Sequence, residues 1–110
     1  MAKRTVRITD YAGRVVRLTQ ERLRHIREHI EMLRQEPKIR DVLRDPDVVW
    51  SSHRDSSVHL YYRHYARSPV GSKQLLVAVK VLEEDAFVLT AFFTDEVKGG
   101  ERIWPKESLD

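Results

Sequence analysis

The chain has 110 residues, a formal net charge of +3 and no cysteine. This length fits one domain covering residues 1–110. The absence of thiols excludes disulfide frameworks, cysteine-ligated zinc and cysteine nucleophiles. No apolar run reaches the ~18 residues of a membrane helix, and the N-terminal residues lack the apolar segment of a secretory signal. We therefore expect a cytoplasmic domain with no membrane partner.

The charge is unevenly distributed along the chain. Residues 1–44 carry 12 Lys and Arg against 6 Asp and Glu, a net charge of +6, whereas residues 45–110 carry 8 against 11, a net charge of −3. A basic half is compatible with a polyanionic partner. It is also typical of a solvated helix face with ion pairs one turn apart, and composition alone favours this second interpretation.

The first half of the chain predicts a β-hairpin followed by two helices. Residues 5–9 and 14–18 alternate apolar and polar side chains around a turn at residues 10–13. Thr19 is a plausible N-cap for a helix over residues 20–35. That helix has one apolar stripe, made of Leu23, Ile26, Ile30 and Leu33. Pro37 ends it and starts a second helix over residues 38–44.

The second half predicts strands. Residues 48–53 and 58–65 read as a strand pair, and residues 101–104 as a last edge strand. Residues 75–82 and 87–93 are the most apolar runs, separated by a short acidic turn, and we expect them to be the central hairpin. The fold class is therefore α+β: an N-terminal β-hairpin and two helices, then an antiparallel sheet of about four strands with the helices on one face. The other face and the helix flank are where we expect a site.

Two histidines stand out on the predicted helix. His25 and His29 are one turn apart on the flank of the apolar stripe, beside Arg22. Such a pair can bind zinc, but the protease pattern needs Glu after the first His, where this chain has Ile26, and no third ligand is evident. We therefore predict no metal site and no cofactor. Histidine is also the usual acid or base near neutral pH.

Other candidate residues lie on the strands. Residues 60–65 interleave tyrosines with Arg63 and His64, which suits base stacking and phosphate binding but is also ordinary strand composition. Thr90 and Thr94 share one strand face. Lys80 lies near Thr90 if the hairpin register is even, and otherwise extends to solvent. RNA cleavage needs only an acid, a base and cations or hydroxyls that stabilise the phosphorane.

Several segments together resemble the phage-type branch of the barnase–EndoU–colicin–RelE-like nucleases, a superfamily of small RNases often used as toxins. The segments that carry the resemblance are residues 18–29, 42–49, 60–63, 75–80, 87–94 and 100–104. The order of elements matches as well. One departure is Ile30-Glu31 after His29, where the family-like motif often has Pro-Glu.

The resemblance implies which residues act. It indicates a helix histidine (His25, with His29 as second choice), Tyr62 or Arg63 on a strand, and Thr90 or Thr94 on a late strand. It implies a metal-independent endoribonuclease of toxin type with RNA as its substrate. The candidate nucleic-acid-binding residues are Arg22, Arg54 and Lys80. Whether an antitoxin or immunity protein is a partner stays open. The alternative is a non-catalytic module that binds nucleic acid or protein. The sequence leaves activity and oligomeric state (monomer or homodimer) open.

Overall fold

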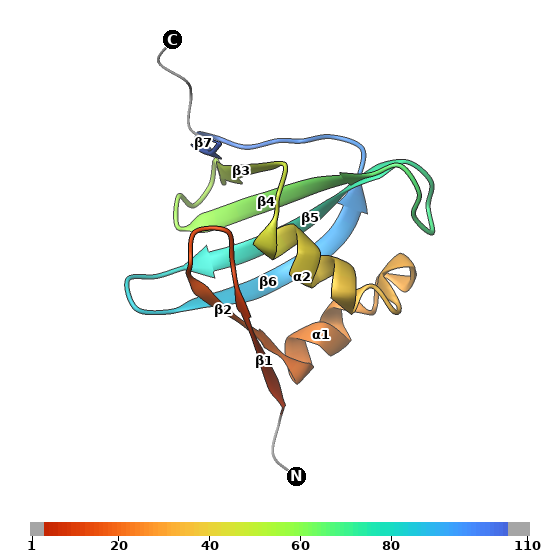
Figure 1. Ribbon diagram of the computed structural model, residues 1–110, viewed down its shortest axis with the longest axis horizontal. Helices are drawn as coiled ribbons and strands as arrows, with labels where there is room; N and C mark the ends of the chain where they lie inside the picture. Colours follow the sequence, from red (N-terminus) through yellow and green to blue (C-terminus); the bar gives the residue numbers. More distant parts are fainter. Residues whose placement is uncertain (1–3, 106–110) are drawn as a thin grey trace.

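A seven-stranded mixed sheet dominates the part of the chain that the structure describes, residues 4–105. In this computed structural model the strands lie in the order β1-β2-β6-β5-β4-β3-β7 (Figure 1). Their bounds are β1 (Thr5–Thr9), β2 (Val15–Thr19), β3 (Val48–Ser51), β4 (Val58–Tyr65), β5 (Lys73–Val81), β6 (Ala86–Thr94) and β7 (Arg102–Trp104).

The prediction of a separate antiparallel sheet of about four strands is therefore wrong, although the α+β class stands. The N-terminal hairpin joins the sheet through a parallel contact between β2 and β6, at Arg17 and Phe87. The late strand β7 joins at the other end, antiparallel to β3. Both contacts connect segments far apart in the sequence, so neither is visible in the hydrophobic pattern of a single strand.

The first predicted helix is shorter than expected. The helix α1 (Gln20–Ile26) begins at the Thr19 cap, whose hydroxyl accepts a hydrogen bond from the Arg22 N–H at 3.0 Å, which confirms that cap. The helix ends at Ile26 rather than Gln35, because the N–H groups of the next turn bond to carbonyls only three residues back. His29 is then extended, and a single 3₁₀ turn, η1 (Ile30–Met32), follows.

This early end changes which apolar residues are buried. Met32 is buried, whereas Ile30 is 78% exposed and Leu33 is 48% exposed. The predicted apolar stripe is thus wrong at its last two positions and correct at Leu23 and Ile26, which belong to the core. The second helix, α2 (Glu36–Arg44), has Pro37 in its first turn and buries Ile39, Val42 and Leu43, close to the prediction.

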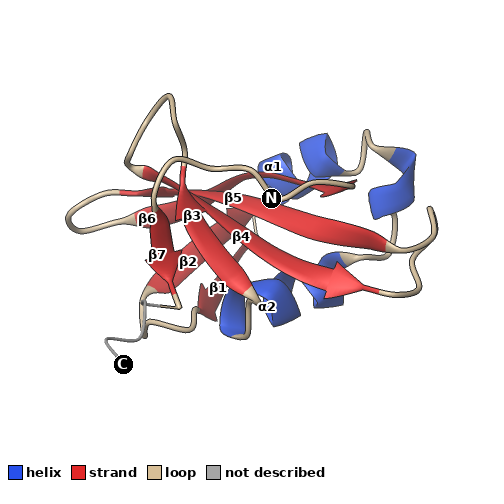
Figure 2. Ribbon diagram, turned by 90° about the horizontal axis from the view of Figure 1, so that it is seen from above, coloured by secondary structure: helices blue, strands red, loops and turns tan. Residues whose placement is uncertain are grey.

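The two helices contact mainly different strands. α2 packs across β4 and β5, while α1 and η1 run beside the outer edge of β6. Figure 2 shows the two helices apart, with strands of the sheet passing between them in that view. Both helices bury apolar side chains in the same core cluster, Leu23 and Ile26 from α1 and Ile39, Val42 and Leu43 from α2. No helix in residues 4–105 is long and apolar enough to cross a membrane.

The register of β5 and β6 determines which side chains share a sheet face. Leu76 pairs with Phe92 and Ala78 with Thr90, and a bulge after Ala78 then places Lys80 opposite Phe87. The alternate residues of these strands face α2 and lie in the core. We call the side away from α2 the open face. In the three central strands it carries Leu60 and Tyr62 from β4, Leu76, Ala78 and Lys80 from β5, and Phe87, Thr90, Phe92 and Thr94 from β6.

Candidate functional site

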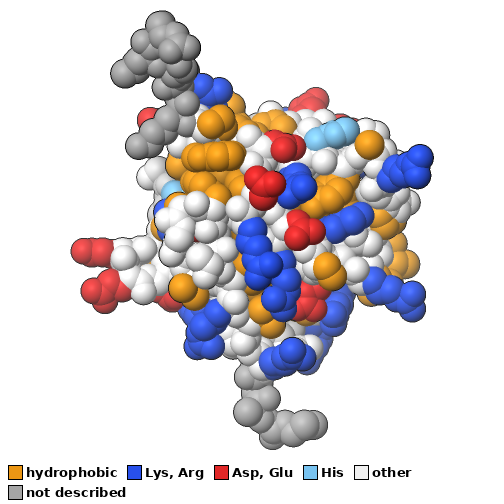
Figure 3. Space-filling model, viewed as in Figure 1, with side chains coloured by type: hydrophobic (Ala, Val, Ile, Leu, Met, Phe, Trp, Pro, Cys, Tyr) orange, Lys and Arg blue, Asp and Glu red, His pale blue; other side chains and the backbone are white. Residues whose placement is uncertain are grey.

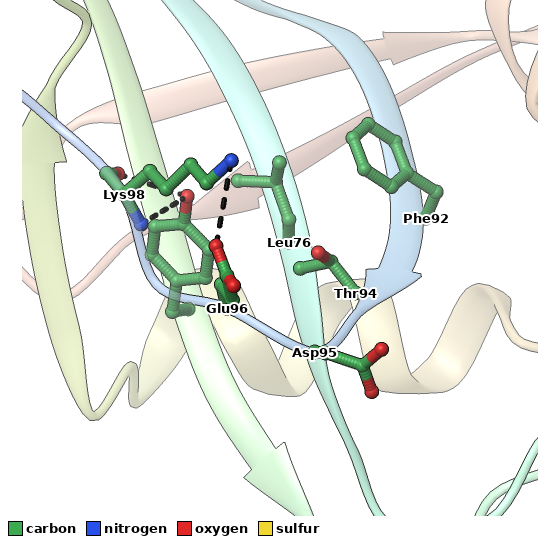
Figure 4. Close-up of a pocket in the computed structure, with 7 residues that line it drawn as sticks. Leu76, Phe92, Thr94, Asp95, Glu96 and Lys98 are labelled. Carbon is green, nitrogen blue, oxygen red and sulfur yellow. Dashed lines mark hydrogen bonds and ion pairs between the residues drawn. The ribbon is translucent and has the colours of Figure 1, made fainter.

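A groove opens on this face at the end of β6. It has a volume of about 470 Å³. Figure 4 shows its apolar floor and its polar rim, which Lys98 overhangs. The residues that line it are Tyr62, Leu76, Phe92, Thr94, Asp95, Glu96 and Lys98. A concave site with an apolar floor and a few polar groups is the usual form of a ligand site.

One wall of the groove is the connection from β6 to β7, residues 95–101, which we call the strap. The Tyr62 hydroxyl holds the strap at its midpoint, because it donates to the Lys98 carbonyl at 2.9 Å and accepts from the Lys98 N–H at 3.2 Å. Gly99 then crosses Trp50 so closely that a Cβ there would lie 2.3 Å from the Trp50 Cβ. Tyr62, predicted as an active residue, is thus a buried support of this wall.

Three charged groups of the strap, Asp95, Glu96 and Lys98, form ion pairs. The Lys98 ammonium lies 3.4 Å from the Glu96 carboxylate, and Asp95 turns to Lys73 on β5. All these groups but Lys73 are well exposed. At the groove the strap therefore offers a cation, Lys98, and two carboxylates, Asp95 and Glu96, that a ligand can compete for.

His29 lies at the opposite side of the groove. Its ring centroid is 5.9 Å from that of Phe92, which lines the groove, with an angle of 41° between the rings. His25 lies four residues earlier, on α1, and is 57% exposed, with Nδ1 at 3.3 Å from the Glu28 carboxylate. Of the two predicted histidines, His29 is therefore the one in contact with a groove residue.

The structure brings several other predicted residues to the same face. Thr94 lines the groove, and Thr90 lies two alternate positions earlier on β6, with Phe92 between them. Lys80 shares the face, but its ammonium is bound to the Asp55 carboxylate at 2.6 Å. That contact, followed by hydrogen bonds from Ser57, lowers the pKa of Asp55 to about 2. Lys80 therefore has its charge already compensated.

The remaining predicted residues lie elsewhere. Arg63 faces away from the groove, where it bonds to the Asp45 carbonyl at 3.2 Å. Arg54 is exposed in the turn between β3 and β4, beside Asp55. Gln20 and Arg27 line a small cavity between α1 and α2. Arg22 lies on the opposite flank of α1.

The zinc hypothesis loses its geometric basis. It needed His25 and His29 on successive turns of one helix, but α1 ends between them. Within residues 4–105 no three His, Asp or Glu side chains gather in an arrangement that could hold a metal ion.

The comparison with known families bears directly on this site. Residues 2–106 match the model of a family described as phage-Barnase-EndoU-ColicinE5/D-RelE like nuclease2. The chain belongs to this nuclease family. The resemblance noted from the sequence is thereby confirmed. No curated protein and no solved structure matches the chain.

Membership of a nuclease family makes nucleic acid the expected substrate class, and it directs attention to groove residues that the sequence did not single out. Phe92, Glu96 and Lys98 were missed. Phe92 had a signal, since it lies between Thr90 and Thr94 on one strand face. Glu96 and Lys98 had none, because only the path of the strap brings them back over the sheet.

Figure 3 shows the α2 side of the molecule, opposite the groove. There Lys and Arg side chains gather mainly in the lower half, where β1, β2 and α1 lie, with fewer acidic side chains among them. On this face, the basic side chains of the N-terminal half of the chain are therefore also gathered in space.

Proposed function

We propose that this chain is a small endoribonuclease of toxin type, which cleaves RNA without a metal ion and uses His29 as an acid–base group. One observation carries the proposal: the His29 ring meets Phe92 at the edge of a groove that Thr94 also lines. A histidine and a threonine, each predicted from the sequence, thus border one concave site of a nuclease-family chain.

Such a site suits internal transfer of the phosphodiester. The ribose 2′-oxygen attacks phosphorus, the bond from phosphorus to the 5′-oxygen breaks, and a 2′,3′-cyclic phosphate remains. One of His29 and His25 takes the 2′-hydroxyl proton, and the other protonates the leaving 5′-oxygen. Negative charge that develops on the phosphorane is stabilised by cations, and we assign this role to Lys98, which lines the groove, and to Arg22 on α1.

Thr94 has a smaller part in this proposal. Its hydroxyl, which points into the groove in Figure 4, donates a hydrogen bond to a phosphate oxygen and so orients the phosphodiester. Lys80 and Arg63 are left out of the reaction centre, since each is already bonded to an aspartate.

The test is cleavage of a mixed pool of tRNA and mRNA with EDTA present. We expect the wild type to cut, His29→Ala to lose about two orders of magnitude in rate, and His25→Ala to lose activity as well. The matched control is His53→Ala, because His53 is exposed in the turn between β3 and β4 and does not line the groove. Full activity in His29→Ala would refute the proposed role.

Binding without cutting would favour the alternative. If the wild type leaves RNA intact but binds it with an affinity that falls steeply with salt, the chain is a non-catalytic nucleic-acid-binding module. If affinity is indifferent to salt, the basic half has another partner.

A further inference from the structure

Two aromatic rings lie at opposite ends of β6 on the open face, and each has a cationic or titratable neighbour. Phe92 meets the His29 ring at the groove. Phe87 lies under Arg17 of β2, whose Cζ is 5.5 Å from the ring centroid. Both phenylalanines are only half-buried. They are five residues apart, or about 15 Å at the rise of a strand, with Thr90 between them.

Arg17 is fixed in place rather than loose. Its Nε and Nη2 donate to the two carboxylate oxygens of Asp85 at 2.9 Å and 2.7 Å, which holds the guanidinium plane against Phe87. Nη1 makes no hydrogen bond among the residues that the structure describes. A guanidinium plane of this kind can stack on a base, and its remaining N–H groups can donate to phosphate.

Arg7 adds an unpaired charge beside it. Arg7 on β1 lies directly opposite Arg17 on β2. Its side chain is exposed and has no partner within residues 4–105. Like charges directly across two strands repel, and Asp85 relieves this repulsion only in part. An anion bound between the two guanidinium groups would relieve it further.

The elements between these ends are also suitable. α1 follows directly on β2 and contacts β6, so Arg22 comes between Arg17 and His29 in the chain, on an element beside the strip. Acidic residues mark both limits of the strip. Glu83 and Glu84 form the turn before Phe87, and Asp95 and Glu96 follow Thr94. Because carboxylates repel phosphate, the favourable region is confined to the length of β6.

We propose that β6 is a binding strip for a short run of unpaired nucleotides, with an outer base-stacking subsite at Phe87 and Arg17, about 15 Å from the groove. The identity of the ligand as RNA follows from the proposed function. The RNA chain runs along β6 with its bases over Phe92 and Phe87 and with its phosphates toward Arg22 and Arg7. The RNA is unpaired here, because base faces reach aromatic side chains only when they are free of a duplex.

The test is the affinity for a short single-stranded oligoribonucleotide with 2′-O-methyl groups, measured by fluorescence anisotropy. This ligand has no free 2′-hydroxyl, so it stays intact throughout. We expect Phe87→Leu to weaken binding about tenfold, as is typical when one stacking ring is removed. Arg7→Ala should lower the slope of log affinity against log salt by about 0.7, the value for one phosphate contact on a single strand.

Two matched controls should bind as the wild type. Phe93→Leu removes a ring from the same strand on the opposite face, and Arg44→Ala removes an exposed charge at the end of α2 that has no partner within residues 4–105. The same oligonucleotide in a duplex should bind more weakly. Wild-type affinity in Phe87→Leu and Arg7→Ala, or equal affinity for the duplex, would overturn the strip. If His29-dependent cleavage persisted in that case, the proposed function would still stand.

Discussion

The buried phenol of Tyr61 gives the sharpest stability test. The Tyr61 side chain is fully buried, and its hydroxyl donates to the Asp10 carboxylate at 2.5 Å. Arg14 Nη1 donates to the same carboxylate at 3.0 Å and to the Tyr61 oxygen at 3.1 Å. Burial, together with Asp10, raises the pKa of Tyr61, so the phenol stays a neutral donor. This network fastens the β1–β2 turn to β4.

Tyr61→Phe removes the hydroxyl alone. Asp10 keeps three donors, the N–H groups of Ala12 and Arg14 and the Arg14 guanidinium, so no charge is left unpaired. The loss is one hydrogen bond to a charged group, which is worth about 2 kcal/mol. For a domain of this size that lowers the melting temperature by roughly 10 °C. Urea unfolding followed by tryptophan fluorescence measures the change in free energy of unfolding.

The control is Tyr65→Phe on the same strand. The Tyr65 hydroxyl is buried and has no hydrogen-bond partner within residues 4–105. Because an unpaired buried hydroxyl costs free energy, its removal should leave stability unchanged or raise it by up to about 1 kcal/mol. Equal losses in Tyr61→Phe and Tyr65→Phe would refute the argument, since the partner in Asp10 is what distinguishes the two phenols.

Three further predictions concern the strap, the end of α1 and pH. Gly99→Ala should reduce RNA cleavage at least tenfold in a single-turnover assay. Gly100→Ala should not, because a Cβ added there meets no atom closer than 3.4 Å. Equal rates in the two variants would mean that the strap does not shape the groove. In urea unfolding, Ile30→Lys should change stability by less than about 0.5 kcal/mol, whereas Ile26→Ala should cost about 3 kcal/mol. Burial lowers the pKa of His59, so the unfolded chain binds its proton more readily. The free energy of unfolding should then fall as pH drops below ~6.5. This fall should be smaller in His59→Gln than in the wild type, and an equal fall in both would contradict the role of His59.

Much of the local structure was readable from the sequence. The bounds of β4, the Thr19 cap and the hairpin of β5 and β6 follow from strand composition, capping chemistry and turn residues. Of the site, the sequence identified His29 and Thr94, because histidine on a helix flank and threonine on an apolar strand are visible exceptions to the pattern. Their roles stay predictions until the cleavage assay is done.

The rest depends on contacts between distant segments. One parallel pair, Arg17 with Phe87, draws the hairpin into the sheet, and nothing in either segment marks it. The end of α1 was missed because Ile30 continues the helical period, yet a tight turn and an extended His29 carry it to solvent. The helical spacing of apolar residues thus predicted buried side chains correctly only up to Ile26, where the helix ends.

The strap has a consequence for how the chain acquires its site. Strand β7 reaches its place only after the chain has passed from β6 over β5 and β4 to the far side of β3. The central strands β4, β5 and β6 can pair without it, but they then lack the wall that carries Glu96 and Lys98. During synthesis the sheet can therefore form before the groove exists. A chain halted at Thr94 would therefore lack one wall of its groove.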